Sequence, residues 1–119
     1  MKKTLVLGAS EKPERYSNKA IKMLRSHQHP VLAIGNKEGQ VLDVHFNKDL
    51  IQDSEIDTVT LYLSPKNQKN YYDYILDLNP KRVIFNPGTE NDELENLLEK
   101  KGIDTIEACT LVMLSTGQY

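Results

Sequence analysis

The residues best suited to chemistry follow the first apolar run of the sequence. Gly8, Ala9 and Ser10 come directly after Thr4–Leu7, where a glycine lets the backbone turn tightly and approach a phosphate group. The complete Gly-x-Gly-x-x-Gly pattern is absent, because Ser10 occupies the place of the second glycine. Gly8 therefore fits a structural turn as well as it fits a phosphate-binding loop.

A second group of residues that suits an anion lies just after this turn. Arg15, Tyr16 and Ser17 precede a segment with helical periodicity, so we expect the Arg15 guanidinium and the Ser17 hydroxyl near a helix N-terminus. Free backbone amides and the helix dipole favour negative charge at such a position. A pyrophosphate could bind there without a glycine-rich fingerprint.

The end of the second apolar run bears on the kind of nucleotide that would fit. This end consists of Ile34, Gly35, Asn36 and Lys37. It carries no carboxylate, whereas NAD sites use an acidic residue here to accept hydrogen bonds from the ribose hydroxyls. Lys37 suits a phosphorylated ribose instead, which both NADP and coenzyme A (CoA) contain. Lys37 fits a solvated loop lysine equally well.

The remaining strand-like runs place no catalytic pair at their ends. Two of them end in Leu63, Ser64 and Pro65 and in Asn86, Pro87 and Gly88. Hydrolases and transferases need a nucleophile with a base, paired carboxylates or metal ligands, and the sequence shows none of these constellations. Cys109 could be a nucleophile, but the small buried apolar residue is the favoured interpretation of a single cysteine. We therefore predict no catalytic and no metal-binding residue.

Length, composition and charge limit the class of protein. The chain has 119 residues, of which 39% are apolar and 27% are charged, and these values are typical of one globular domain. We expect a single domain over residues 1–119. The formal net charge of -2 favours neither nucleic acid nor an anionic membrane as a partner. No apolar run reaches the roughly 18 residues of a membrane-spanning helix, and we expect a cytoplasmic location.

Apolar periodicity predicts the elements that position these residues. Strands are expected at Thr4–Leu7, Val31–Ile34, Asp57–Leu63, Arg82–Phe85 and Ile103–Glu107. Helices are expected over about 18–27, 65–78, 91–101 and 109–114, with a loop over 36–52 that contains a short helical turn at 49–51. Right-handed crossovers join such runs into a parallel sheet. We therefore predict an α/β class, a three-layer Rossmann-like doubly wound sheet of five parallel strands, whose ligand binds at the carboxyl ends of the strands.

Three stretches of the sequence together carry a family resemblance. They are Gly8-Ala9-Ser10 followed by Pro13, Arg15-Tyr16-Ser17 and Ala20; Asn86-Pro87-Gly88 followed by Glu90-Asn91; and Ala108-Cys109-Thr110-Leu111-Val112-Met113-Leu114. In this order and spacing, the chain resembles the CoA-binding domain family of small Rossmann-like proteins. That family is similar to the N-terminal coenzyme-binding domain of the succinyl-CoA synthetase alpha subunit.

The resemblance implies a CoA pocket across the strand ends. Gly8–Ser10 would lie against the pyrophosphate with Arg15 nearby, and Ile34–Lys37 would meet the adenosine and its 3′-phosphate. Leu63–Pro65 would border the adenine or the pantetheine arm, and Asn86–Gly88 would face the pantetheine. The phosphorylated histidine of the synthetases lies in a second domain that this chain is too short to contain, so ligase activity is not expected.

The leading hypothesis from the sequence is non-catalytic binding of CoA or an acyl-CoA. Cys109 is included among the cofactor-binding candidates, because it could lie close enough to exchange with the CoA thiol. Two alternatives stay open. One is an NADP-dependent reductase, in which Lys37 would hold the 2′-phosphate and Tyr62 or His45 would donate a proton. The other is an interaction domain with a vestigial nucleotide cleft. A homo-oligomer or a protein partner is compatible with each of them.

Overall fold

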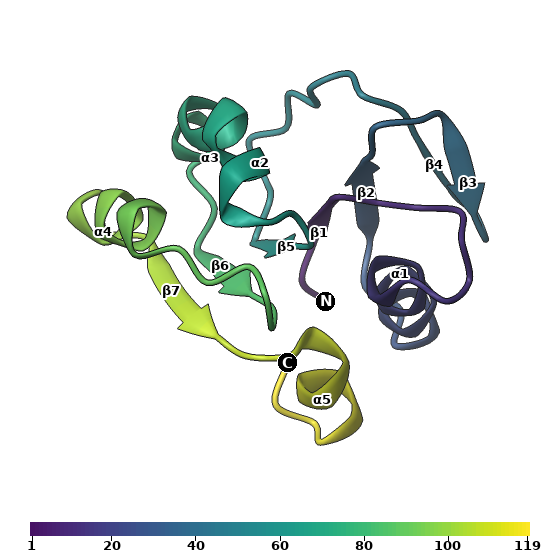
Figure 1. Cartoon of the computed structure of the whole chain (residues 1–119). Helices are drawn as coiled ribbons and strands as arrows, with labels where there is room; N and C mark the ends of the chain where they lie inside the picture. Colours follow the sequence, from purple (N-terminus) through teal and green to yellow (C-terminus); the bar gives the residue numbers. More distant parts are fainter.

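Five short strands form the parallel sheet that the apolar runs predict. The computed structural model describes residues 1–119, with β1 (Thr4–Leu7), β2 (Val31–Ile34), β5 (Thr58–Leu61), β6 (Arg82–Phe85) and β7 (Asp104–Glu107). Their order in the sheet is β2-β1-β5-β6-β7, and each neighbouring pair is parallel. The predicted α/β fold with five parallel strands is confirmed (Figure 1).

Helices cover both faces of this sheet and give the fold its three layers (Figure 1). On one face, α1 (Tyr16–Ser26) packs against α5 (Thr110–Ser115). On the other face lie α3 (Tyr72–Leu78) and α4 (Asp92–Lys100). None of the helices combines the length and the apolar character that crossing a membrane requires.

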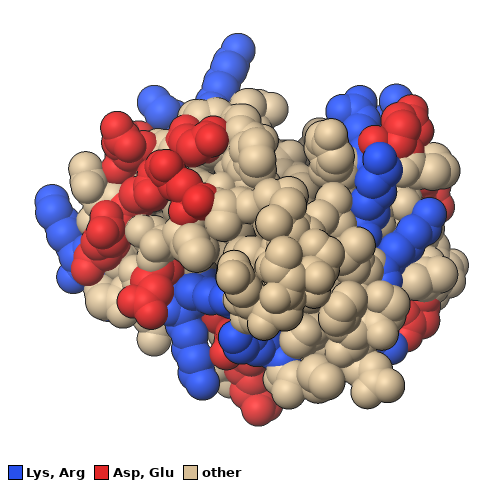
Figure 2. Space-filling view, turned by 90° about the horizontal axis from the view of Figure 1, so that it is seen from below, with Lys and Arg blue, Asp and Glu red and all other residues tan.

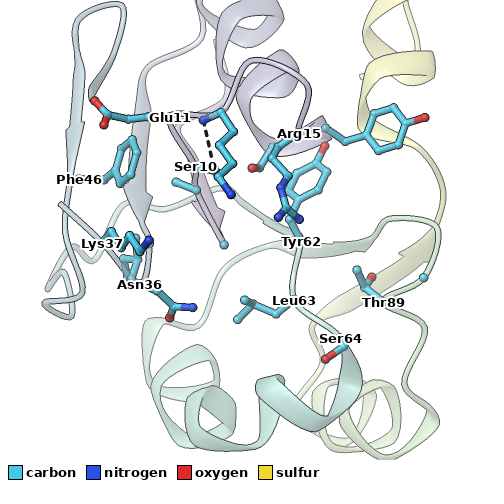
Figure 3. Close-up of a pocket in the computed structure, with 18 of the residues that line it drawn as sticks. Ser10, Glu11, Arg15, Asn36, Lys37, Phe46, Tyr62, Leu63, Ser64 and Thr89 are labelled. Atoms are coloured by element: carbon cyan, nitrogen blue, oxygen red, sulfur yellow. Dashed lines mark hydrogen bonds between the residues drawn. The ribbon is translucent and has the colours of Figure 1, made fainter. Parts of the chain in front are cut away.

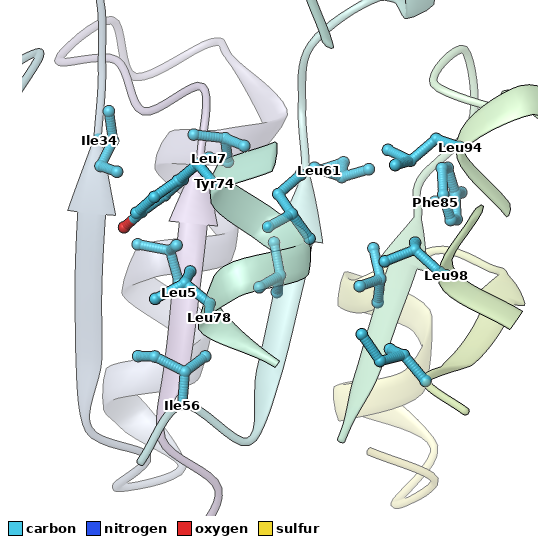
Figure 4. Close-up of a cluster of buried hydrophobic side chains, with 14 residues drawn as sticks. Leu5, Leu7, Ile34, Ile56, Leu61, Tyr74, Leu78, Phe85, Leu94 and Leu98 are labelled. Carbon is cyan, nitrogen blue, oxygen red and sulfur yellow. The ribbon is translucent and has the colours of Figure 1, made fainter. Parts of the chain in front are cut away.

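Alternation along the strands divides the core between the two faces. Leu5 and Leu7 of β1 are fully buried in a cluster that includes Leu98 of α4 (Figure 4). Val6, between them, faces the opposite cluster, which includes Leu24 of α1. Because apolar burial on both faces is the main favourable term in folding, the ends of the central strands are rigidly supported.

Residues 36–52 differ from the predicted loop. Gly39–Val41 (β3) and Val44–Phe46 (β4) form a two-stranded antiparallel hairpin, and residues 49–51 form no helical turn. The prediction was wrong because each strand has only three residues, too few for an alternating pattern to stand out. The turn at Leu42, which has a φ of 53°, also lacks the Asn-Gly signal that marks most tight hairpins.

The helix predicted over residues 65–78 is divided. It consists of α2 (Pro65–Gln68), the 3-10 turn η1 (Lys69–Tyr71) and α3, and it ends at Asn79, whose φ is 51°. The start at Pro65 and the end before Pro80 agree with the prediction. The break follows Gln68, which is completely buried. Because the polar side chain of Gln68 is buried at this point, the segment differs from an ordinary surface helix, whose polar residues face solvent.

A group of carboxylates on α4 and β7 lies at the β7 edge of the sheet, where acidic side chains gather on the surface (Figure 2). Carboxylate oxygens of Asp92, Glu95 and Glu107 lie within 4.8 Å of one another. Burial, together with the neighbouring Glu107 carboxylate, raises the pKa of Glu95 to about 7. Protonated Glu95 therefore contributes stability that is complete below its ordinary pKa of 4.5 and is lost as the pH rises through about 7.

We expect Glu95→Gln to raise the free energy of unfolding near pH 8 and to change it little near pH 4.5. The neutral amide cannot ionise, so it removes the cost of a buried carboxylate beside Glu107, which the folded protein carries only at the higher pH. Urea unfolding at the two pH values measures the difference. Glu99→Gln, an exposed change of the same charge on the same helix, is the matched control. A gain of equal size at both pH values would contradict the raised pKa of Glu95.

Candidate functional site

The carboxyl ends of the central strands border one cleft of about 740 Å³ (Figure 3). The strand β1 lies between β2 and β5, so the winding of the chain reverses here, which is where doubly wound folds bind ligands. The lining comes from residues 8–12 and 15–17, between the end of β1 and the first turn of α1, and from residues 34–38 at the end of β2. Residues 62–64 after β5, residues 87–89 after β6, Phe46 and Tyr71 complete it.

The structure brings together most of the residues that the sequence predicts for the site. The lining includes Gly8, Ala9, Ser10, Arg15, Tyr16, Ser17, Ile34, Gly35, Asn36, Lys37, Leu63, Ser64, Pro87 and Gly88. Pro65 begins α2 and Cys109 precedes α5, and both lie outside the lining, as does Asn86. That the lining residues contact a ligand stays a prediction.

Asn86 is buried under the cleft rather than facing it. It is 2% exposed, and its Nδ2 donates to Thr60 Oγ1 at 2.7 Å and to the Leu61 carbonyl at 2.9 Å. Its Oδ1 accepts from the Thr110 amide at 2.8 Å. These bonds tie β6 to β5 and to the start of α5. Asn86 therefore fixes the base of the loop that contains Pro87. The sequence predicted that Asn86 faces the cleft, but the structure directs its side chain away from it.

Several lining residues were missed by sequence reasoning. They are Glu11, Lys12, Glu38, Phe46, Tyr62, Tyr71 and Thr89. Most of them adjoin residues that were predicted, so extending each loop would have found them. No predicted site residue adjoins Phe46 or Tyr71 in the sequence. Phe46 reaches the cleft from the hairpin of β3 and β4, and Tyr71 reaches it from η1, where the helix is broken after α2. Tyr62 had been considered only as a proton donor.

The floor of the cleft is a close approach of backbone segments around Gly8. The Gly8 and Ala9 amides both donate to the Ile34 carbonyl at 2.9 Å. Gly8 has a φ of 106°, and a Cβ there would lie 2.9 Å from the carbonyl oxygen of Tyr62. Only glycine adopts this conformation without strain and leaves room for the loop after β5. Gly8 therefore allows three strand ends to converge.

The N-terminus of α1 opens onto the cleft and favours an anion. Arg15 precedes the helix without forming a side-chain cap, and the first turn contains no acidic residue. The first amides of a helix have no partner within it and carry the positive end of its dipole. The Arg15 side chain is exposed and belongs to none of the ion pairs in the structure. Free amides and an unpaired guanidinium thus face the same space.

The end of β2 presents both signs of charge, which the sequence did not reveal. Glu11, from the loop after β1, reaches this end of the cleft, and Glu38 lies beside Lys37. The Glu11 carboxylate accepts a hydrogen bond from the Gln40 amide at 2.9 Å, so one of its oxygens is engaged by β3. Lys37 is exposed and forms no ion pair. Both sequence interpretations of Lys37, a partner for a phosphorylated ribose and a solvated loop lysine, fit this position.

The two side chains considered as proton donors differ in position. Tyr62 lines the cleft, and burial raises the pKa of its hydroxyl to about 12. A hydroxyl with this pKa stays protonated at neutral pH and is a poor proton donor to a reacting group. His45 lies on the exposed side of the hairpin and does not line the cleft. Neither Tyr62 nor His45 therefore fits the role of proton donor that the reductase hypothesis gave them.

A parallel sheet with this strand order and a cleft at its switch point define a Rossmann-like α/β domain of the class that binds ligands at strand ends. The family model described as the CoA binding domain matches residues 2–115. The chain belongs to this family, and the resemblance seen in the sequence is confirmed.

Solved structures share the fold over nearly the whole chain. An uncharacterized protein is 50% identical, with a TM-score of 0.97 over 100% of this chain and 98% of that one. A hypothetical protein from Pyrococcus horikoshii OT3 is 29% identical (TM-score 0.86, 97% and 82% covered). A conserved hypothetical protein from Pyrococcus furiosus is 24% identical (TM-score 0.82, 94% and 98% covered). Comparison with the curated proteins finds no match.

Proposed function

We propose that residues 1–119 form one binding domain that holds CoA or an acyl-CoA in this cleft without transforming it. The observation that carries the proposal is the uncapped N-terminus of α1 beside the unpaired Arg15, at the switch point of the sheet. Membership of the CoA binding domain family supports it. The cleft volume of about 740 Å³ also lies in the range of small-molecule sites.

The pyrophosphate belongs at the N-terminus of α1 in this proposal. The amides of Tyr16 and Ser17 open the helix, and the Ser17 side chain is buried where it lines the cleft. Helix amides stabilise a phosphate through hydrogen bonds and through the dipole. Arg15 adds a guanidinium, which can donate two hydrogen bonds to phosphate oxygens. Together, the helix amides and Arg15 neutralise the negative charge of the pyrophosphate, so no glycine-rich loop is needed.

The adenosine belongs at the end of β2, where an apolar wall and a free cation adjoin. Phe46 and Ile34 supply buried apolar surface, and Asn36 and Lys37 are exposed at the rim (Figure 3). An adenine ring can bury its faces on such a wall. In this proposal the Lys37 ammonium pairs with the 3′-phosphate. The pantetheine arm then extends between the loops after β5 and β6.

We expect Lys37→Gln to weaken CoA binding about 3- to 10-fold and to leave dephospho-CoA binding unchanged. The loss is smaller than for a desolvated charged hydrogen bond, because Lys37 is exposed to solvent. Isothermal titration of both ligands measures the two affinities. Lys22→Gln, on the exposed surface of α1 and outside the cleft lining, removes the same charge and serves as the control. Equal weakening of both ligands by Lys37→Gln would remove Lys37 from the 3′-phosphate site.

Parallel titration of nucleotide-free protein with CoA, NADP and NAD tests the proposed function. CoA is expected to bind more tightly than NAD, because the exposed Lys37 ammonium at the end of β2 can pair with the 3′-phosphate of CoA, whereas NAD carries no 2′- or 3′-phosphate. Binding of NADP alone would support the reductase hypothesis instead. A folded protein that binds none of the three would support an interaction domain with a vestigial cleft.

A further inference from the structure

One completely buried amide connects two of the loops that border the cleft. Gln68, at the end of α2, is 0% exposed. Its Nε2 donates to the carbonyl oxygens of Leu63 and Thr89, each at 2.8 Å. Leu63 and Thr89 both line the cleft, one from the loop after β5 and one from the loop after β6. Each hydrogen of a single amide group thus holds a different wall.

Between residues 62–68 and residues 86–91, the only hydrogen bonds are those of the Gln68 side chain. The ladder between β5 and β6 ends at the pair Leu61 and Phe85. No backbone hydrogen bond joins residues 62–68 to residues 86–91. The sheet therefore fixes the bases of the two loops, whereas Gln68 sets their separation further out, where they border the cleft.

The orientation of the Gln68 amide is fixed by Asn91 at the start of α4. Gln68 Oε1 accepts from Asn91 Nδ2 at 2.9 Å, and the same nitrogen donates to the Tyr72 hydroxyl at 2.8 Å. Asn91 Oδ1 accepts from the Leu94 amide at 3.2 Å as the helix cap. If the Gln68 amide were flipped, its Oε1 would face the carbonyl oxygens of Leu63 and Thr89, and its Nε2 would face Asn91 Nδ2. Only one arrangement satisfies both buried amides.

We propose that Gln68 is a positioning residue that sets the width of the pantetheine end of the cleft. This inference rests on the proposed function, because it places the pantetheine arm between the loops after β5 and β6. A saturated, buried amide network is rigid, so the separation of Leu63 and Thr89 is set before a ligand arrives. Binding then does not have to order these loops, and pre-organisation of this kind raises affinity.

Three variants separate positioning from general stability. Gln68→Leu keeps similar volume and removes both bonds to the loop carbonyls. Asn91→Asp keeps the cap on the Leu94 amide and removes the donor that orients Gln68, so it tests the same network if Gln68→Leu fails to fold. Tyr74→Phe is the control, because it removes the hydrogen bond from the Tyr74 hydroxyl to the Ile51 carbonyl, which belongs neither to this network nor to the cleft lining.

Two ligands distinguish the pantetheine end from the rest of the cleft. We expect Gln68→Leu to weaken CoA binding about 10-fold or more, as for loss of a buried hydrogen-bonded network. Adenosine 3′,5′-bisphosphate, which lacks the pantetheine arm, should bind within about twofold of the wild type, since its groups meet other loops. Asn91→Asp should act in the same sense, and Tyr74→Phe should leave both affinities unchanged. Equal weakening of both ligands, or unchanged CoA affinity, would overturn the assignment.

Hydrogen exchange on the ligand-free protein tests the same inference without reference to CoA. In Gln68→Leu, amides of residues 62–68 and 86–91 should exchange faster than in the wild type, while those of β1 and β2 should not. Unchanged exchange in both loops would overturn the positioning role. If wild-type protein binds neither CoA nor the bisphosphate, the proposed function fails, and the exchange data still decide whether Gln68 holds the loops.

Discussion

Replacing Gly8 with alanine is expected to weaken CoA binding at least about 10-fold and to lower the free energy of unfolding by about 2–4 kcal/mol. Two costs combine at this position. The φ of 106° is strained for any residue with a Cβ, and that Cβ would lie 2.9 Å from the Tyr62 carbonyl oxygen. Relief of the contact moves the loop after β5 away from the loop after β1, and both loops line the cleft.

Gly102→Ala is the matched control for Gly8→Ala. Gly102 follows α4 with a φ of 81°, and a Cβ there would meet no atom within 4 Å. It therefore carries the backbone strain without the steric contact and lies outside the cleft lining. We expect it to lose about 1–2 kcal/mol of stability and to bind CoA normally. Chemical unfolding and calorimetric titration of both variants measure the difference, and identical behaviour would show that the contact at Gly8 is unimportant.

The second large effect is expected from Arg15→Ala. If the guanidinium forms a charged hydrogen bond with the pyrophosphate, its loss should cost about 1.5–3 kcal/mol, or about 10- to 150-fold in affinity. The stability of the free protein should change little, because Arg15 is exposed and forms no ion pair. The affinity of the variant should also depend less on salt concentration, since a charge pair has been removed.

Arg25→Ala controls for the change in net charge. Arg25 lies in the last turn of the same helix, pairs with Asp43 at 2.9 Å and does not line the cleft. We expect its affinity for CoA to stay within about twofold of the wild type, because exposed charges more than a Debye length apart are screened. If Arg15→Ala and Arg25→Ala weaken binding equally, the effect belongs to overall charge and not to a pyrophosphate contact.

The parallel strands other than the exposed edge strand β7 were predictable because they are largely buried. Such strands appear in the sequence as continuous apolar runs, and Thr4–Leu7, Val31–Ile34 and Arg82–Phe85 have the predicted bounds. Most of the cleft followed from this result, since its lining is simply what comes after each strand. Local sequence therefore indicated both the scaffold and the edge of the sheet at which a ligand would bind.

The features that escaped prediction depend on contacts distant in the sequence. Gln68 gives no local sign of burial, because its partners Thr89 and Asn91 lie more than 20 residues later. Asn86 belongs to an Asn-Pro-Gly turn, and only its bonds to Thr60 and Thr110 direct it inward. Apolar periodicity shows which face of a helix or strand is buried. It does not show which polar side chain is buried with hydrogen-bond partners from distant parts of the chain.

Titration of isotope-labelled protein with CoA, followed by amide NMR spectra, tests the central claim most directly. The account predicts that the perturbed amides belong to residues 8–17, 34–38, 62–64 and 88–89, with the largest changes at the N-terminus of α1. Perturbations confined to another surface, such as the acidic region of α4 and β7, or no perturbation at saturating CoA, would contradict CoA binding in this cleft.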